Sequence, residues 1–437
     1  MRIAFLSVLL LCFKADLKAQ TALFDVIDYA ATIEPAITSQ SLRGKVTVLF
    51  KAESANLNTI TLNAGKLDID TITQGTSYLK FEKKGNQLII YLAQALQLRQ
   101  QDSINIIYHG SPKSGLVFSP KQMQVYTLFS TSQWMPCVEA PDDKATFHLK
   151  LIVPNNFKTV ANGLCIRQQK TADGKLISEW VQNISVSAYL FGFATGKFKE
   201  VIQVRKDIRL RYLTTARFST NSIQKIFSHT ADMLHFYELK SGIKYPDKTY
   251  TQVLVSGSAE QEMSSFTVMN EDYGMQVLDD TTDIWLAAHE CAHQWWGNGV
   301  TNQNWLHFWL NEGMANFITA AYLEHCFGKL YYDVQIAAYR QVYEELRSRG
   351  KDKPLVFPDW DHPVSDDRKL VYNKGGYVLH LLRAELGEDL FWKGIKAYTQ
   401  NFWGKSVSTL NFQHSMEAAT GKDLSAFFDK WVYVTSR

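Results

Sequence analysis

Two histidines lie four positions apart at His289 and His293, with Glu290 beside the first. Residues four apart share one face of an α-helix, so both imidazoles can face a single ion. Glu290 projects to the side, where its carboxylate could accept a proton from a water at that ion. Glu312 follows after residues 294–311 and supplies a carboxylate. Nitrogen ligands and one carboxylate are what a catalytic Zn²⁺ prefers, so the pattern indicates a zinc hydrolase with its histidines on a helix.

The residues around this motif extend the pattern. His293 begins the run His-Gln-Trp-Trp-Gly-Asn, and Glu312 lies in Trp-Leu-Asn-Glu-Gly-Met-Ala. These segments resemble the gluzincin aminopeptidases, the relatives of membrane alanyl aminopeptidase and leukotriene hydrolase. In that family two histidines and a glutamate at this spacing hold zinc. The resemblance therefore implies one Zn²⁺ per chain, held by His289, His293 and Glu312.

The composition limits the partners. The chain has 437 residues, enough for two or three domains, and 46% of them are hydrophobic, enough for a sizeable core. A formal net charge of +3 is nearly balanced and gives no reason to expect nucleic acid or an anionic membrane surface as a partner. Peptide substrates are what the resemblance implies.

The N-terminus has the pattern of a secretory signal. Arg2 gives a positive start, residues 3–13 are mostly apolar, and Ala19 is a small residue at which cleavage could occur. The alternative of a membrane anchor fails on length, because a spanning helix needs about 20 apolar residues. We therefore expect residues 1–19 to be a signal peptide and the mature chain to be exported, periplasmic or secreted, without a membrane span.

Four cysteines remain after that segment: Cys137, Cys165, Cys291 and Cys326. Four in a chain of this size do not make a disulfide scaffold. A Cys137–Cys165 bridge is possible, and the sequence does not decide it.

The first half of the mature chain is predicted to be β. Short apolar or alternating segments separated by Asn, Gly and Asp recur, and no long helical periodicity appears before about residue 221. The segments are 45–50, 87–92, 103–108, 148–153 and 178–184. They predict an all-β saddle or sandwich domain over residues 20–200. Three further landmarks at residues 135–147, 160–163 and 189–193 also resemble the family, although Glu139 stands where the family usually has aspartate.

The second half, residues 201–437, has a helical pattern and should form a thermolysin-like mixed α/β catalytic domain, which makes the fold class α+β. The first predicted elements are a helix with Ile226, Met233 and Tyr237 on one face and a strand from Thr251 to Ser256. A helix capped within Asp280–Asp283 should carry both histidines. A helix with Glu312 should end before Gly328, and another helix should span residues 371–386.

The resemblance also assigns two further site residues. Tyr372, in Tyr-Asn-Lys-Gly, matches the family's tyrosine that donates a hydrogen bond to the oxyanion. Glu260 lies where the family has a glutamate that binds the substrate's free α-amine, and counting back from Phe266 favours it over Glu262. That match is loose, since the flanking methionine and asparagine of the family are replaced here.

Two departures leave the reaction open between alternatives. Leu128 and Ser130 stand where the family often has Gln and Glu around the substrate amine. The resemblance ends near Trp431, without the long C-terminal helical domain of larger members, so we expect a short form with a more open cleft. The sequence therefore predicts a zinc aminopeptidase, with an open-cleft endopeptidase, another zinc hydrolase, or a non-catalytic peptide-binding protein as alternatives.

Overall fold

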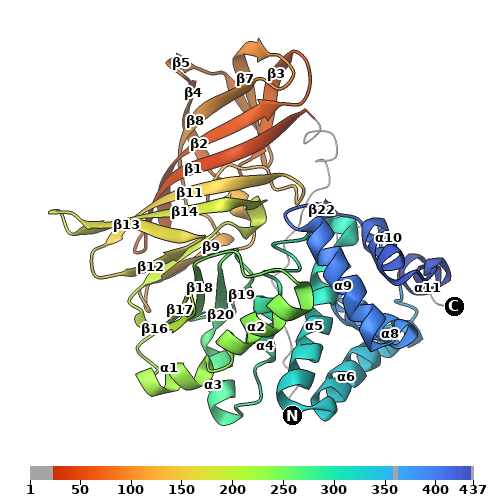
Figure 1. Ribbon diagram of the computed structural model, residues 1–437. Coiled ribbons are helices and arrows are strands. Elements are labelled where there is room, and N and C mark those ends of the chain that lie inside the picture. The colour runs from red at the N-terminus through yellow and green to blue at the C-terminus, as the bar shows by residue number, and fades with distance from the viewer. Residues whose placement is uncertain (1–22, 358–362, 435–437) are drawn as a thin grey trace.

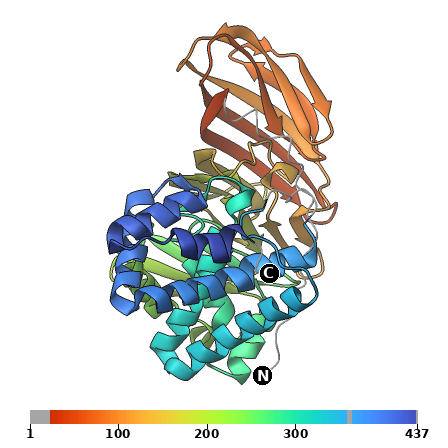
Figure 2. The same cartoon turned by 90° about the vertical axis from the view of Figure 1, so that its right-hand side faces the viewer.

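The computed structural model describes residues 23–357 and 363–434. The predicted signal peptide, residues 1–19, lies outside them. Figures 1 and 2 show two lobes, a β-rich one that holds the N-terminal half and a helix-rich one that holds the C-terminal half. Within the described ranges, no helix has the length and apolar character needed to cross a membrane.

The β lobe is built around an eight-stranded sheet of order β13-β14-β11-β1-β2-β8-β4-β5. All its pairings are antiparallel except β1 with β11. A sheet of order β3-β7-β6 and another of order β12-β15-β10-β9 complete the lobe. The strands are β1 Phe24–Ala36, β2 Ser41–Ala52, β3 Leu57–Asn63, β4 Asp68–Gln74, β5 Ser77–Tyr78, β6 Phe81–Lys84, β7 Gln87–Leu96, β8 Gln101–Gly110, β9 Gly115–Ser119, β10 Gln124–Leu128, β11 Lys144–Pro154, β12 Lys158–Ala161, β13 Leu164–Lys170, β14 Lys175–Ser187 and β15 Phe193–Gly196.

Alternation of buried and exposed side chains explains why these segments are strands. Along β2, Leu42, Gly44, Val46, Val48 and Phe50 are buried, while the residues that alternate with them are partly or fully exposed. All five strand segments predicted above lie within β2, β7, β8, β11 and β14. The cysteines of the described part are free thiols, Cys137 and Cys165 among them, so the possible bridge between those two is not formed.

The helix-rich lobe begins with a mixed sheet of order β16-β17-β18-β20-β19. Its three central strands run parallel, and both edge strands are antiparallel to their neighbours. These strands are β16 Lys199–Arg205, β17 Ile208–Thr214, β18 Thr249–Val255, β19 Glu260–Gln261 and β20 Phe266–Asn270, and a short pair follows, β21 Thr301–Asn302 with β22 Ser406–Val407.

Helices make up the rest of this lobe (Figure 1). They are α1 Thr220–Ile226, α2 Thr230–Ser241, α3 Glu271–Asp279, α4 Trp285–Ala292, α5 Trp309–Phe327, α6 Lys329–Ser348, α7 Ser365–Lys369, α8 Gly375–Leu386, α9 Glu388–Phe402, α10 Thr409–Thr420 and α11 Ser425–Phe428, with π-helices η5 Leu370–Lys374 and η6 Asp429–Tyr433. Helix α5 is buried on all sides along Trp309–Leu323, so it forms the centre of the lobe.

The mixed sheet lies between two hydrophobic cores. Val253, Val255 and Val268 belong to the core of the β lobe. Leu254 and Met269, from the opposite face of the same strands, belong to the helical core. Because successive strand residues face opposite ways, this sheet joins the two lobes into one packed body.

Two predictions of local structure are wrong. The predicted helix with Ile226 and Met233 is two helices, α1 and α2; in the turn between them Phe227 stacks on Tyr212, with ring centroids 4.7 Å apart. The caps predicted within Asp280–Asp283 do not cap α4: Asp280 accepts from the Thr282 amide instead, and the residue before α4 is Ile284.

The predicted fold class is confirmed: an all-β domain precedes a mixed α/β domain. The domain boundary predicted between residues 200 and 201 falls inside β16 and stays a prediction.

Candidate metal centre and active site

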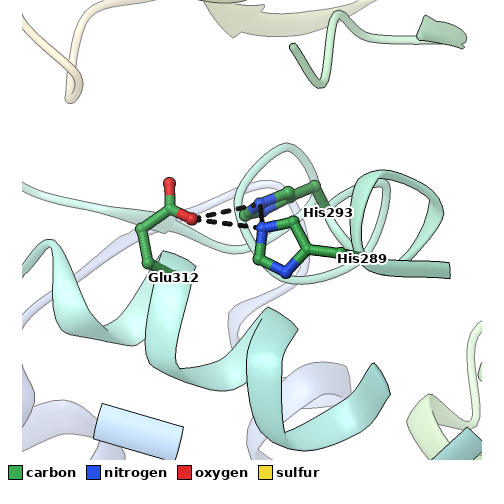
Figure 3. A group of neighbouring side chains, drawn as sticks. All are labelled: His289, His293 and Glu312. Atoms are coloured by element: carbon green, nitrogen blue, oxygen red, sulfur yellow. Dashed lines mark hydrogen bonds and ion pairs between the residues drawn. The ribbon is translucent and has the colours of Figure 1, made fainter. Parts of the chain in front are cut away.

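His289, His293 and Glu312 converge on one point (Figure 3). The two Nε2 atoms lie 3.1 Å apart, and Glu312 Oε2 lies 3.4 Å from each of them. All three side chains are buried. Among the described residues, this is the one group of His, Cys, Asp or Glu ligand atoms close enough together to hold a metal ion. The structure thus brings together the three predicted ligands.

Neighbouring residues orient the imidazoles. His293 Nδ1 lies 3.0 Å from the Trp296 carbonyl oxygen, which can only accept a hydrogen bond. Nδ1 therefore carries the proton, and Nε2 keeps its lone pair for a metal. The His289 ring stacks on Trp285, with centroids 4.8 Å apart, and Trp285 Nε1 donates to the Tyr339 hydroxyl. These contacts fix both rings before any ion binds.

The electrostatics of the group fit a cation. Burial lowers the pKa of His293, but the carboxylates of Glu312, Glu262 and Glu290 together outweigh burial and raise that pKa to about 10. Burial raises the pKa of Glu312, but His293 and His289 together outweigh it and lower the pKa to about 2. Glu312 Oε2 has no hydrogen-bond partner among the described residues. A buried carboxylate between two imidazoles is a donor set that zinc accepts, and metal binding displaces the proton.

Glu290 follows His289 on α4 and is 5% exposed. Its Oε2 atom has no hydrogen-bond partner among the described residues, and burial raises its pKa well above the ordinary value, partly offset by the charge on His293. A buried carboxylate with one unpartnered oxygen beside a metal triad can hold and release a proton.

Tyr372 lies in the π-helix η5, and not in a regular helix as predicted. Its ring is nearly parallel to that of His289, with centroids 6.0 Å apart, and its carbonyl accepts from Asn316 Nδ2 of α5 at 2.9 Å. Burial raises the pKa of Tyr372, and the carboxylate of Glu312 adds to this, so the phenol stays protonated and can donate. π-bulges are frequent at functional sites.

Glu260 and Glu262 occupy different environments. Glu260 is the first residue of β19, and its Oε1 accepts from Asn270 Nδ2 at 2.9 Å. Glu262 lies beyond the strand and is 7% exposed. Burial raises the pKa of Glu262, the charge on His293 lowers it, and Glu312 raises it again, so Glu262 lies within electrostatic reach of the triad. The carboxylates of Glu262 and Glu260 both raise the pKa of Glu290, and Glu262 is the more deeply buried of the two. The role predicted for Glu260 stays a prediction.

Sequence reasoning left three side-chain amides out of the site. Asn162, Gln294 and Asn298 hold the backbone around Glu262. Gln294 and Asn298 both lie in the His-Gln-Trp-Trp-Gly-Asn run that begins at His293, so their place in the motif was a signal that could have drawn attention to them. Asn162 lies about 100 residues before Glu262 in the sequence. Its only signal was its place in residues 160–163, which resemble the family.

Two family models cover most of the chain. Residues 226–431 match the Peptidase family M1 domain, and residues 26–190 match the Peptidase M1 N-terminal domain. Together with the geometry above, this places the chain among the zinc metallopeptidases. It belongs to peptidase family M1, and the His289–His293–Glu312 group fits the single catalytic zinc of that family.

The curated relatives are longer. The chain is 26% identical over 396 residues to probable aminopeptidase 1 of Saccharolobus solfataricus, covering 85% of this chain and 49% of the relative. It is 24% identical over 342 residues to a leucyl aminopeptidase of the same organism, covering 75% and 42%. The chain thus spans about half the length of the curated relatives it matches.

Solved structures of similar size share the fold. A two-domain M1 zinc metallopeptidase bound to L-tryptophan superposes with a TM-score of 0.81 at 22% identity, covering 95% of both chains. The M1 zinc metallopeptidase from Deinococcus radiodurans gives 0.80 at 21%, covering 96% of this chain and 95% of that one. At this identity the likeness shows the fold, and the two-domain arrangement fits it.

Proposed function

We propose that this chain is a zinc aminopeptidase that removes residues from the free amino end of peptides. The carrying observation is that Glu262 is buried and that the charges of two triad members, His293 and Glu312, act on its carboxylate. A negative charge beside the metal, where a peptide's amino end would lie, selects a free ammonium group. Family membership and the names of the relatives support the same activity.

The roles of the residues follow from their positions. His289, His293 and Glu312 would hold zinc, which when bound polarises a carbonyl and makes water a nucleophile near neutral pH. Glu290 accepts the proton of the attacking water and delivers it to the leaving amine. Tyr372 donates its hydroxyl hydrogen to the oxyanion of the scissile carbonyl. Glu262 binds the substrate's ammonium and sets the register.

Matched peptides test this function. One has a free and one an acetylated N-terminus, and each is assayed with and without a zinc chelator. Chelator-sensitive cleavage of the free peptide alone supports the aminopeptidase. Equal cleavage of both favours the open-cleft endopeptidase, and cleavage of neither favours the non-catalytic alternative. A neighbouring structure that holds a Tyr-Ser-Ala substrate suggests tripeptides of that size as probes.

We also propose that the chain is exported. The support is the N-terminal pattern, with Arg2, an apolar segment and a small residue at Ala19. N-terminal sequencing of the protein recovered from an exporting host should show cleavage near Ala19; an intact Met1 would contradict export through this segment.

A further inference from the structure

Residues 262–265, here called the anchor loop, connect β19 to β20 and carry Glu262. The loop is buried throughout. Its backbone therefore needs hydrogen-bond partners other than water. Backbone groups supply some of them: the Thr251 amide of β18 donates to the Ser265 carbonyl at 3.1 Å, and the Ser264 amide donates to the Leu190 carbonyl at 3.3 Å. Buried side-chain amides from both lobes supply others.

The helical lobe contributes two of these amides. Asn298 Nδ2 donates to the Glu262 carbonyl at 3.0 Å, and Gln294 Nε2 donates to the Met263 carbonyl at 3.0 Å. Gln294 Oε1 accepts from the Ser265 amide at 2.9 Å. Helix α4 ends at Ala292, so of the two histidines it carries only His289, and His293 is its C-cap residue. Gln294 is the next residue and Asn298 follows in the same segment, so both amides relate the anchor loop to the metal triad.

The β lobe contributes Asn162, which is 1% exposed. Its Nδ2 donates to the carbonyls of Ser264 and Leu190, each at 2.8 Å. Its Oδ1 accepts from the Gly192 amide at 2.7 Å. Both amide hydrogens and the oxygen are thus used, and they join three segments that are far apart in sequence.

The end of the anchor loop has a conformation that needs this support. Ser265 has a backbone φ of +69°, in the left-handed region that residues other than glycine rarely adopt. Such a conformation costs on the order of 1 kcal/mol and persists only where the surroundings fix it. The Gly163 amide, adjacent to Asn162, donates to Ser265 Oγ at 2.5 Å. The β lobe therefore contributes to holding the Ser264 and Ser265 side of the loop, together with Gln294 of the helical lobe.

We propose that Asn162 is a positioning residue, through which the β lobe sets the place of the Glu262 carboxylate and with it the affinity for the substrate's amino end. This inference rests on the proposed function, because it takes Glu262 as the amine anchor. It gives the β lobe a part in substrate recognition, although Asn162 itself does not touch the substrate.

Removing Asn162 should act on binding more than on chemistry. The Ser264 carbonyl and the Gly192 amide would lose their partner, and the loop would relax away from its left-handed end. Glu290 and Tyr372 have separate supports in α4 and η5, so proton transfer and oxyanion binding would be retained.

The first experiment compares Asn162→Ala with Asn155→Ala, an exposed asparagine of the same lobe. For a peptide with a free amino end, Asn162→Ala should raise KM roughly tenfold, the effect of losing one well-placed interaction, with kcat changed about twofold or less. Zinc content should stay at one per chain in both variants. A folded, zinc-loaded Asn162→Ala enzyme with wild-type KM would overturn the proposal.

The second experiment separates positioning from general support of the fold. If Asn162 acts through Glu262, Asn162→Ala should have little further effect on KM in a Glu262→Gln background. If Asn162→Ala raises KM by the same factor in the wild-type and Glu262→Gln backgrounds, its role is merely structural and the proposal is overturned. Should Asn162→Ala fail to fold, Asn162→Asp replaces it. This variant keeps the acceptor for the Gly192 amide but places a carboxylate against two carbonyls. Its KM is then compared with that of Asn155→Ala, and its effect on KM is compared between the wild-type and Glu262→Gln backgrounds.

The outcomes distinguish a failure of this inference from a failure of the proposed function on which it rests. If the wild type cleaves acetylated and free peptides alike, or Glu262→Gln keeps the wild-type KM, the amine anchor is wrong and both proposals fail. If the wild type requires a free amine and depends on Glu262, while Asn162→Ala behaves as the wild type, the inference alone fails.

Discussion

Gly313 of α5 lies directly against Gly375 of α8: a Cβ atom built on Gly313 would be 2.8 Å from the Gly375 Cα. Gly313 follows the proposed zinc ligand Glu312, and Gly375 follows the π-helix that carries Tyr372. Contact of backbone with backbone therefore sets the spacing between the metal triad and the proposed oxyanion donor, and it leaves no room for a side chain.

Gly313→Ala should lower both stability and turnover. The added methyl group meets backbone, which cannot move aside as a side chain can, so we expect a loss of about 1–3 kcal/mol in the free energy of unfolding. The matched control is Gly394→Ala in α9, where the new Cβ would meet the flexible end of Met416. Thermal unfolding and kcat of both variants test this. Equal losses of stability and kcat in the two variants would show that the backbone contact at Gly313 is no more sensitive to an added methyl group than the side-chain contact at Gly394.

Glu290→Gln should keep zinc and lose nearly all turnover, because an amide cannot accept the proton of the attacking water. General acid–base catalysis contributes about 10²–10⁴-fold, so kcat should fall by at least that factor. Metal analysis and kcat measure the two parts, with exposed Glu344→Gln of α6 as the control. Hydrolysis at the wild-type rate would show that another group is the base.

His293→Ala should lose zinc as well as activity, because two ligands seldom hold zinc where three are needed. The measurement is zinc per chain after dialysis, with His235→Ala, an exposed histidine of α2, as the control. A fully zinc-loaded and active His293→Ala protein would exclude this residue as a ligand.

The zinc triad could be predicted from sequence because its geometry is local. A spacing of four fixes two side chains on one helix face, and Glu312 lies in the first turn of the next buried helix. The β-to-helix order of the chain could be predicted because side-chain periodicity is also local. Such features do not depend on which distant segments come together.

The choice between Glu260 and Glu262 as the proposed amine anchor could not be made in the same way. Glu260 and Glu262 are two residues apart, so alternation along a strand would place both on one face, but the strand ends at Gln261. The backbone around Glu262 is held by Asn162, Gln294 and Asn298, which come from other parts of the chain. Side-chain periodicity likewise did not predict the π-helix that carries Tyr372, whose carbonyl accepts a hydrogen bond from Asn316 of α5.

Tyr372→Phe should reduce kcat while leaving KM and zinc content nearly unchanged. The ring that lies parallel to His289 remains, and only the donor to the oxyanion is removed. Loss of one oxyanion donor costs about 10²–10³-fold in kcat. The control is Tyr331→Phe in α6, which removes the hydroxyl of a tyrosine that is 36% exposed. If kcat is retained, some other donor binds the oxyanion.

The contact between the lobes should weaken in acid through Glu200 of β16. Its carboxylate accepts from Arg211 Nε at 2.8 Å and from Lys158 Nζ of the β lobe at 3.0 Å, while Arg211 also donates to the Thr159 carbonyl. Burial raises the pKa of Glu200, but these cations outweigh burial and lower it below the ordinary 4.5. The stabilisation is therefore complete above pH 4.5 and is lost as the pH falls through the lower, folded-state pKa.

Glu200→Gln should accordingly lower the free energy of unfolding by about 1–2 kcal/mol at pH 7, because Arg211 loses its charged partner while largely buried. The gap between variant and wild type should close as the pH falls below 4.5, since the wild-type carboxylate then takes up a proton. Denaturant unfolding at several pH values measures this, with exposed Glu385→Gln as the control. A gap that stays constant with pH would mean that Glu200 stabilises the junction by packing and not by its charge.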